Sequence, residues 1–198
     1  MLKKLNPAFY QEADVLKVAH NLLGKQLWTN FNNVITSGII VEVEAYCGAT
    51  DKACHAYPDK KTPRTMGMYE NGGAAYIYLI YGMYHLFNIV TNTNGSADAV
   101  LIRAIEPAVG KEIIFKRRNT NKRNWLLSGG PGRLSQALGI TTKFDGTDLQ
   151  GDTIWLTDGI DYPENEIMSS QRIGVESAGE AAHYPWRFYI KGNKYVSK

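Results

Sequence analysis

Apolar and polar positions along the chain recur with two periods, one typical of helices and one typical of strands. Between residues 13 and 23 apolar side chains recur every three or four positions, which predicts an amphipathic helix that ends at Gly24. Residues 34–43 are rich in Ile and Val and contain no Pro, which predicts a buried strand. Turn residues separate this strand from a shorter one predicted at 26–29, so the two can form a hairpin.

A second hairpin is predicted further along the chain. Residues 74–79 and 84–91 have the aromatic and β-branched composition of strands. Between them lies Ile80-Tyr81-Gly82-Met83, which suits a tight turn because Gly82 adopts positive φ at little cost. Tyr81 would then project from the tip of the hairpin, unless its ring folds back onto the hairpin itself.

The pattern in the rest of the chain is less regular. The predicted elements are strands at 100–104, 153–157, 172–176 and 187–190, and helices at 110–118 and 134–138. Residues 47–73 lack apolar periodicity, and a loop of this length in a compact domain is uncommon unless it has a function. The 198 residues are enough for one sizeable core, so we expect one domain covering residues 1–198.

Two acidic residues lie at the end of the strand predicted at 34–43. Glu42 and Glu44 share one face of the strand, and Val41 and Val43 share the other. Because burial of an unpaired charge is costly, each carboxylate must reach water, a cation or a hydrogen-bond donor. One interpretation is a strand that leaves the core with two solvated acids. The other is a carboxylate at a strand end that faces a cleft and activates a water molecule.

Composition and charge limit the class of protein. A hydrophobic content of 44% and a charged content of 21% are ordinary for a globular protein. The net charge of +3 is only mildly basic, so a nucleic-acid partner has to be argued from where the charges lie. Pro7 interrupts the first segment before a signal-peptide core develops, and no apolar run approaches the roughly 20 residues of a membrane span. We therefore expect a cytoplasmic protein that does not contact membranes.

Metal and thiol chemistry are weak candidates. Cys47, Cys54 and His55 lie close together, but a closed zinc site needs four nitrogen or sulfur ligands, and the other histidines lie in unrelated elements. A nucleophilic pair of Cys54 and His55 is disfavoured because adjacent residues of an extended chain point apart. We expect no metal site, and neither cysteine receives a role.

Glu44 has better surroundings for chemistry. Tyr46 shares its face if the strand continues, and His55 and Tyr78 lie in the irregular loop and in the second hairpin. Flat rings around a carboxylate can hold a flat ligand, and a flat cation most strongly. With basic residues nearby and Tyr81 exposed, the set suits DNA, because a wedge can enter the base stack while a pocket receives the extruded base.

Several motifs follow one another in a fixed order along the chain. They are Val41-Glu42-Val43-Glu44-Ala45-Tyr46, Thr62-Pro63-Arg64, Tyr76-Ile77-Tyr78, Ile80-Tyr81-Gly82-Met83-Tyr84, Leu101-Ile102-Arg103-Ala104-Ile105-Glu106-Pro107, Gly130-Pro131-Gly132-Arg133-Leu134 and Pro185-Trp186-Arg187-Phe188-Tyr189. In this order they resemble the alkyladenine (3-methyladenine) DNA glycosylase family of base-excision repair. The match extends over almost the whole chain, so it is more specific than any single motif.

The resemblance implies a fold and an activity. The implied fold is a mixed α/β (α+β) single domain on a curved antiparallel sheet, with flanking helices and a protruding β-hairpin. The implied enzyme is a minimal, bacterial-type DNA glycosylase that acts as a monomer on duplex DNA containing alkylated or deaminated purines and uses no cofactor. Because no lysine is identified for a Schiff base with the sugar, we expect hydrolysis of the N-glycosidic bond without strand cleavage.

The resemblance also implies residue roles. Glu44 would deprotonate the water that attacks the deoxyribose C1′, and Arg103 would contact the phosphate side of the flipped nucleotide or help hold the water. Glu42 would be a supporting or solvated acid. The remaining candidates are, for base binding, Tyr46, His55, Tyr78 and Asn88, for insertion into the DNA, Tyr81, and for the DNA backbone, Arg64, Gly82, Met83 and Arg133.

Two other functions stay open at this point. One is a non-catalytic protein that binds the minor groove with Tyr81 as a wedge. The other is a hydrolase of free nucleosides, which would share Glu44 and the aromatic pocket but need no wedge. The sequence does not rank the lesions, and it identifies no acid that would assist the departure of a neutral base.

Overall fold

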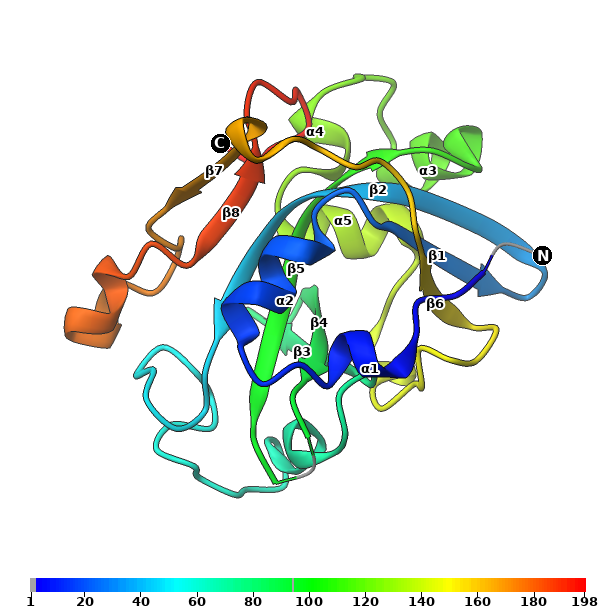
Figure 1. Cartoon of the computed structure of the whole chain (residues 1–198). Helices are drawn as coiled ribbons and strands as arrows, with labels where there is room; N and C mark the ends of the chain where they lie inside the picture. Colours follow the sequence, from blue (N-terminus) through cyan, green and yellow to red (C-terminus); the bar gives the residue numbers. More distant parts are fainter. Residues whose placement is uncertain (1–2, 94) are drawn as a thin grey trace.

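An eight-stranded antiparallel sheet forms the centre of the computed structural model, which describes residues 3–93 and 95–198 (Figure 1). The main path of the sheet runs β3-β4-β5-β2-β1-β6, and β8 joins β7 to β2. The strands are β1 Gln26–Phe31, β2 Val34–Tyr46, β3 Ala75–Ile80, β4 Tyr84–Thr91, β5 Asp98–Pro107, β6 Ile154–Thr157, β7 Ile167–Ser170 and β8 Arg187–Ile190. The mixed α/β class and the antiparallel sheet implied by the resemblance are confirmed. Residues 1, 2 and 94 of the expected domain lie outside the described residues.

Helices cover both faces of this sheet (Figure 1). Helix α2 packs on β2 and β5, whereas α5 packs on β4 and β5 from the opposite face with α3 and α4 beside it. The helices are α1 Pro7–Tyr10, α2 Val15–Leu22, α3 Lys111–Arg118, α4 Trp125–Ser128 and α5 Pro131–Leu138, with short 3-10 segments η1 Met66–Tyr69, η2 Thr142–Phe144, η3 Glu164–Glu166 and η4 Glu176–His183. None of the helices in the described part of the chain combines the length and apolar character that a membrane crossing requires.

Helix α2 shows how local signals set an element. The Asp14 side chain accepts hydrogen bonds from the backbone N–H groups of Leu16 and Lys17, so the helix begins directly after Asp14. Its apolar face packs into the main core, as the spacing predicts. Gly24 follows with a φ of 82°, and a Cβ there would lie 1.9 Å from the Ile160 carbonyl oxygen. The predicted helix and its end are confirmed.

Strand β2 is the longest strand, and from Thr36 to Ala45 it is buried. Its first half pairs with β1, its second half pairs with β8 along the same edge, and β5 follows the other edge. Val41 and Val43 belong to the main core, and Glu42 and Glu44 on the opposite face have no exposed surface. The interpretation of a strand that leaves the core with two solvated acids is therefore wrong. Strand β8 and the chain segments that pack beside it cover the acids, and no local pattern indicates this.

One predicted strand is wrong. Residues 172–176 form no strand, and β7 lies earlier, at Ile167–Ser170, where it pairs with β8. Two contacts and one backbone conformation explain the difference. The backbone N–H of Ile173 donates to the Glu44 carboxylate instead of a neighbouring strand, Arg172 points into a buried ion pair, and Gly174 has a φ of 80°.

The hairpin of β3 and β4 has the predicted turn. Tyr81 and Gly82 have φ values of 53° and 68°, so the chain reverses in the left-handed region. The Tyr81 side chain is 84% exposed, which rules out the alternative that its ring folds back onto the hairpin. Among the other predicted elements, α5 begins earlier than expected, at Pro131, and β5 is longer than 100–104.

Candidate active site

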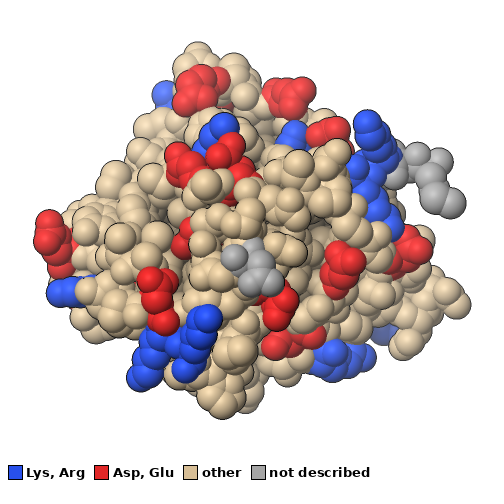
Figure 2. All heavy atoms as spheres, turned by 60° about the horizontal axis from the view of Figure 1, so that its bottom comes forward, with Lys and Arg blue, Asp and Glu red and all other residues tan. Residues whose placement is uncertain are grey.

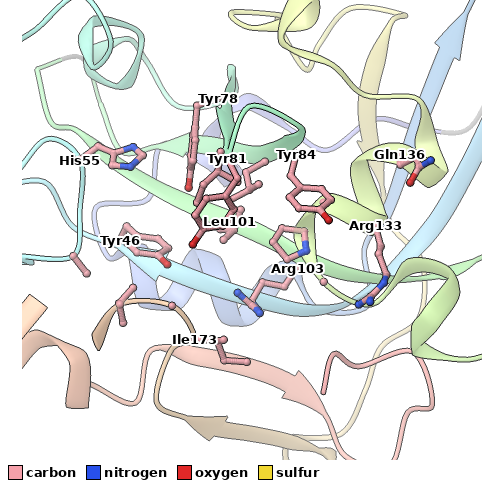
Figure 3. A pocket seen from close by; sticks show the side chains of 18 of the residues that line it. Tyr46, His55, Tyr78, Tyr81, Tyr84, Leu101, Arg103, Arg133, Gln136 and Ile173 are labelled. Carbon is pink, nitrogen blue, oxygen red and sulfur yellow. The ribbon is translucent and has the colours of Figure 1, made fainter. Parts of the chain in front are cut away.

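An open cleft of about 700 Å³ lies on the side of the sheet that carries α5 (Figure 3). Its walls come from the end of β2, the loop after β2, the β3–β4 hairpin, strand β5, the start of α5 and the segment 173–175. Tyr46, His55 and Tyr78 gather at one end of the cleft, and Arg133 and Gln136 lie at the other (Figure 3). A volume of this size is in the usual range for ligand sites, about 300–1,000 Å³.

Glu44 lies directly behind the wall of this cleft. Its carboxylate accepts hydrogen bonds from the Tyr46 hydroxyl and from the Ile173 backbone N–H, both at 2.8 Å. Arg103 Nη1 lies 3.2 Å from the same carboxylate. All three partners line the cleft, whereas Glu44 itself has no exposed surface. A hydroxyl, a backbone amide and a cation thus hold the carboxylate beside the cleft and separate it from the open space.

Arg103 links Glu44 to the second acid of β2. Its side chain is only 7% exposed, and its Nε donates to Glu42 Oε1 at 2.9 Å. Burial alone would lower the pKa of Arg103, but the charges of Glu44 and then Glu42 raise it above its usual range. Arg103 is therefore a permanent, almost buried cation at the wall of the cleft (Figure 3).

Arg172 fixes the ring of Tyr46 from behind. Its guanidinium carbon lies 4.7 Å from the centroid of the Tyr46 ring and 5.2 Å from that of Trp186. The guanidinium forms a fully buried ion pair with Asp51. Burial, and then the Glu44 carboxylate, raise the pKa of Tyr46 well above its usual range, so its hydroxyl remains a hydrogen-bond donor.

His55 is a neutral ring with a defined tautomer. Arg64 Nη2, which can only donate, lies 3.2 Å from His55 Nε2, so Nε2 is the acceptor. Nδ1 then carries the proton and donates to the Tyr76 hydroxyl at 3.1 Å. Burial, and then the charge of Arg64, lower the pKa of His55 to about 4. Its ring packs edge-on against Tyr78, with centroids 4.6 Å apart.

The remaining predicted contact residues lie at different depths. Asn88 is buried behind the rings, where it lines a void of about 20 Å³ and donates to the Tyr76 carbonyl at 3.0 Å. It does not line the large cleft. Arg64 does line the cleft, with its guanidinium carbon 5.1 Å from the centroid of the Tyr78 ring. The base-binding role expected of Asn88 would therefore require contact through this inner void.

The hairpin tip and α5 carry the other predicted contacts. Tyr81 lines the cleft (Figure 3). Gly82 and Met83 follow it in the exposed turn. Arg133 lines the far end of the cleft and donates to the Gly129 carbonyl at 3.2 Å. The structure thus brings together every predicted catalytic and base-binding residue except Asn88 within one cleft or directly behind its wall.

The cleft itself is positively charged. Its wall contains Arg64, Arg118 and Arg133 besides Arg103, which is paired with Glu42 and Glu44, and none of the described residues that line the cleft is acidic. On the face shown in Figure 2, acidic and basic side chains are interspersed, which agrees with the small net charge. The local charge of the cleft, rather than the net charge, therefore favours an anionic ligand such as a nucleic-acid backbone.

Sequence reasoning missed two contributors to the site. Arg172 and Ile173 lie in the segment 172–176, whose local composition predicts a strand, and their partners Asp51 and Glu44 are more than a hundred residues away in the chain. Arg118 is an intermediate case. It belongs to a run of five basic residues between positions 116 and 123, which indicates either a solvated helix end or the border of an anion site, and it lines the cleft.

Cys54 lines the small void behind the rings, whereas Cys47 lines neither that void nor the cleft. Both are free, and burial raises the pKa of Cys54 to about 12, so its thiol is protonated and unreactive. Within the described residues, no group of three or more His, Cys, Asp or Glu side chains is arranged to hold a metal ion. Neither observation gives the cysteines a chemical role.

Comparison with known proteins supports the family resemblance inferred from the motifs. The family description of methylpurine-DNA glycosylase (MPG) matches residues 8–194. Proteins from Bacillus cereus (strain G9842), Bacillus thuringiensis (strain Al Hakam) and Bacillus anthracis (strain A0248) are each 48% identical to this chain over 97% of its length and 98% of theirs. Each carries the provisional name 3-methyladenine DNA glycosylase. The resemblance inferred from the motifs is confirmed, and the chain belongs to the methylpurine-DNA glycosylase family, as a DNA N-glycosylase and thus a hydrolase of DNA repair.

Proposed function

We propose that the protein flips alkylated or deaminated purines out of duplex DNA and hydrolyses their N-glycosidic bond, leaving an abasic site. The name of the relatives points to 3-methyladenine as one such base. The observation that carries the proposal is the place of Glu44, directly behind the end of the cleft where Tyr46, His55 and Tyr78 gather. A base stacked among these rings would bring its sugar close to the groups that hold Glu44.

Glu44 is the general base in this mechanism. Its Oε1 accepts the Ile173 N–H and keeps a second lone pair that can accept from a water. Because Glu44 has no exposed surface, the water reaches it when Tyr46 or the segment 173–175 shifts as the nucleotide enters. Arg103 then orients the carboxylate and helps hold the water. Removal of one proton makes the water a nucleophile for the deoxyribose C1′.

The departing base needs no acid if it is already a cation. Alkylation at N3 or N7 gives a purine a positive charge, so it can leave without protonation, and a single carboxylate suffices where ordinary glycosidases use two. The structure supports this preference. No described carboxylic acid lines the cleft, and the low pKa of His55, about 4, makes its ring a poor source of protons. Neutral lesions such as hypoxanthine should therefore react more slowly.

The exposed hairpin tip and the arginines would open and hold the DNA. Tyr81 is 84% exposed at the tip and would enter the base stack in place of the flipped nucleotide. Gly82 and Met83 next to it, with Arg64 and Arg133 in the cleft, would contact the backbone. Since no described lysine lines the cleft, no Schiff base with the sugar is expected, and the strand stays intact.

A set of duplexes that each carry one modified purine tests this function. We expect release of 3-methyladenine or 7-methylguanine, slower release of hypoxanthine, and no trapping of a covalent complex by borohydride. Glu44→Gln should abolish base release while DNA binding persists. Glutamine keeps the shape of the side chain, but it cannot take the proton from the attacking water. Glu106→Gln is the matched control, since Glu106 lies on β5 outside the cleft and contacts Asn193.

Three outcomes would contradict the proposal. Equal release by Glu44→Gln and the wild type would remove Glu44 as the base. Loss of DNA binding in parallel with activity would show that Glu44 acts on structure. Hydrolysis of free nucleosides at the rate for duplex DNA, unaffected by Tyr81→Ala, would favour a nucleoside hydrolase.

A further inference from the structure

A buried cluster of charges lies beneath the groups that touch Glu44. Glu42 Oε1 accepts hydrogen bonds from Arg103 Nε at 2.9 Å, from Arg187 Nε at 2.8 Å and from Ser197 Oγ at 2.7 Å. Glu42 Oε2 accepts from the Ser197 backbone N–H at 2.7 Å. Glu42 has no exposed surface, and Ser197 is 9% exposed. The segment that carries Ser197 thus returns to the middle of β2 and closes over this acid.

We propose that Glu42 and Ser197 are positioning residues. They set how Arg103 is shared between Glu42 and Glu44 and thereby adjust how readily Glu44 acts as the general base. The inference rests on the proposed role of Glu44. It assigns a function to two residues that do not touch the cleft and would act only through Arg103.

The geometry of Arg103 shows how this sharing works. Its Nε lies 2.9 Å from Glu42, its Nη1 lies 3.2 Å from Glu44, and its Nη2 donates to Ser197 Oγ at 3.4 Å. One guanidinium therefore spans two carboxylates and a hydroxyl. Because Ser197 supplies two donors to Glu42, that acid is partly satisfied without Arg103. Arg103 is then free to keep its Nη1 directed at Glu44.

The charges in the cluster balance. Glu42 and Glu44 face Arg103 and Arg187, so two negative charges meet two positive charges. Burial alone would raise the pKa of Glu42, but Arg103, the Ser197 amide and Arg187 together lower it, so Glu42 remains charged. A buried ionic cluster adds little stability compared with apolar packing of the same volume. The arrangement of the cluster around Arg103 is therefore better explained by a role in positioning Arg103 beside Glu44 than by a contribution to stability.

Loss of Glu42 and loss of Ser197 should have opposite effects on the interaction between Arg103 and Glu44. Without the charge of Glu42, Arg103 acts on Glu44 alone, which favours the ionised form and moves the acidic limb of the pH–rate profile to lower pH. Without the Ser197 hydroxyl, Glu42 attracts Arg103 more strongly, and the limb moves to higher pH. Among the described residues, the other ionisable groups beside Glu44 are Tyr46 on β2, Tyr78 on β3, Arg172 after β7 and Arg187, which pairs with Glu44 from β8, and they are the same in both variants.

Single-turnover base release across a pH series tests the inference. For Glu42→Gln we expect a rate lower by roughly 10- to 100-fold, less than the 10²- to 10⁴-fold typical of a general base, with the acidic limb at lower pH. For Ser197→Ala we expect a smaller loss and the limb at higher pH, and Ser197→Thr, which keeps a hydroxyl, should restore the wild-type profile. DNA affinity should not change.

Two matched controls separate positioning from packing. Ser170→Ala removes a hydroxyl that accepts from Arg187 at 3.0 Å without touching Glu42, and Glu106→Gln removes an acid of the same sheet outside the cluster. Both should keep the wild-type profile.

The inference is overturned if Glu42→Gln and Ser197→Ala match these controls or move the limb in the same direction. If Glu42→Gln does not fold, the Ser197→Ala and Ser197→Thr pair decides. Failure of the proposed function would look different, because Glu44→Gln would then release base as the wild type does.

Discussion

The buried pair of Asp51 and Arg172 allows a quantitative prediction. Both side chains are fully buried, and Arg172 Nη2 donates to Asp51 Oδ1 at 2.9 Å. Burial alone would lower the pKa of Arg172, but Asp51 raises it, so the guanidinium stays charged. Asp51→Asn keeps the shape and removes the negative charge, which leaves a buried cation with neutral partners.

The structure sets the size of the effect. Removal of one partner from a buried ion pair typically costs about 3–5 kcal/mol. Arg172 keeps bonds to the carbonyls of Ala45 at 2.8 Å and Ala181 at 2.9 Å, and Asn keeps one acceptor oxygen. We therefore expect the lower end, about 3 kcal/mol, which for a domain of this size lowers Tm by roughly 6–12 °C.

Urea and thermal unfolding measure this loss against a matched control. Asp158→Asn breaks the pair with Lys25, in which the Asp158 side chain is 78% exposed, and should cost about 1 kcal/mol or less. The double variant Asp51→Asn with Arg172→Met removes the unpaired cation and should recover part of the stability.

The reasoning is refuted if Asp51→Asn loses no more stability than Asp158→Asn. It is also refuted if the double variant is less stable than Asp51→Asn alone. Because Arg172 precedes Ile173, whose N–H binds Glu44, base release by Asp51→Asn should fall as well.

Three further predictions concern DNA and acid. Tyr81→Ala should leave unfolding within about 0.5 kcal/mol of the wild type because the ring is 84% exposed, yet it should weaken capture of the flipped nucleotide by roughly 1–3 kcal/mol; an unchanged single-turnover rate on duplex DNA would contradict the wedge. Arg133→Gln should reduce the slope of log Kd against log salt by about 1, whereas Arg123→Gln, outside the cleft, should reduce it less; equal slopes would argue against a phosphate contact at Arg133. The pKa of Glu42 is lowered below its usual value of 4.5, so its contribution to stability is present above about pH 4.5 and is lost as the pH falls below that. Tm measured down to about pH 3 should therefore decline less steeply for Glu42→Gln than for the wild type, and parallel declines would exclude this contribution.

Local sequence patterns determined most of the elements. The apolar spacing and the Asp14 cap specify α2, and the turn residues at Tyr81 and Gly82 specify the second hairpin. These features depend on residues only a few positions apart, so periodicity and turn chemistry suffice to predict them. Strand alternation and residue chemistry also pointed to Glu44 and Tyr46, and the order of motifs along the chain identified the family, which implied a role for Arg103.

Local patterns failed where a segment depends on distant partners. Residues 172–176 have apolar and β-branched members, and a strand is a reasonable prediction from them alone. In the structure, Arg172 binds Asp51 and Ile173 binds Glu44, at sequence separations of 121 and 129 residues. These long-range contacts fix the segment as an irregular wall of the cleft.

The sequence by itself determined that two acids lie on one face of a strand, because side chains alternate along extended backbone. Only the tertiary structure decided that both acids are buried and what each one binds. Glu42 is enclosed by Arg103, Arg187 and Ser197, the last of them 155 residues away in the chain. Alternation fixes which face a side chain occupies, but the solvation and charge of that face depend on whatever distant segments pack against it.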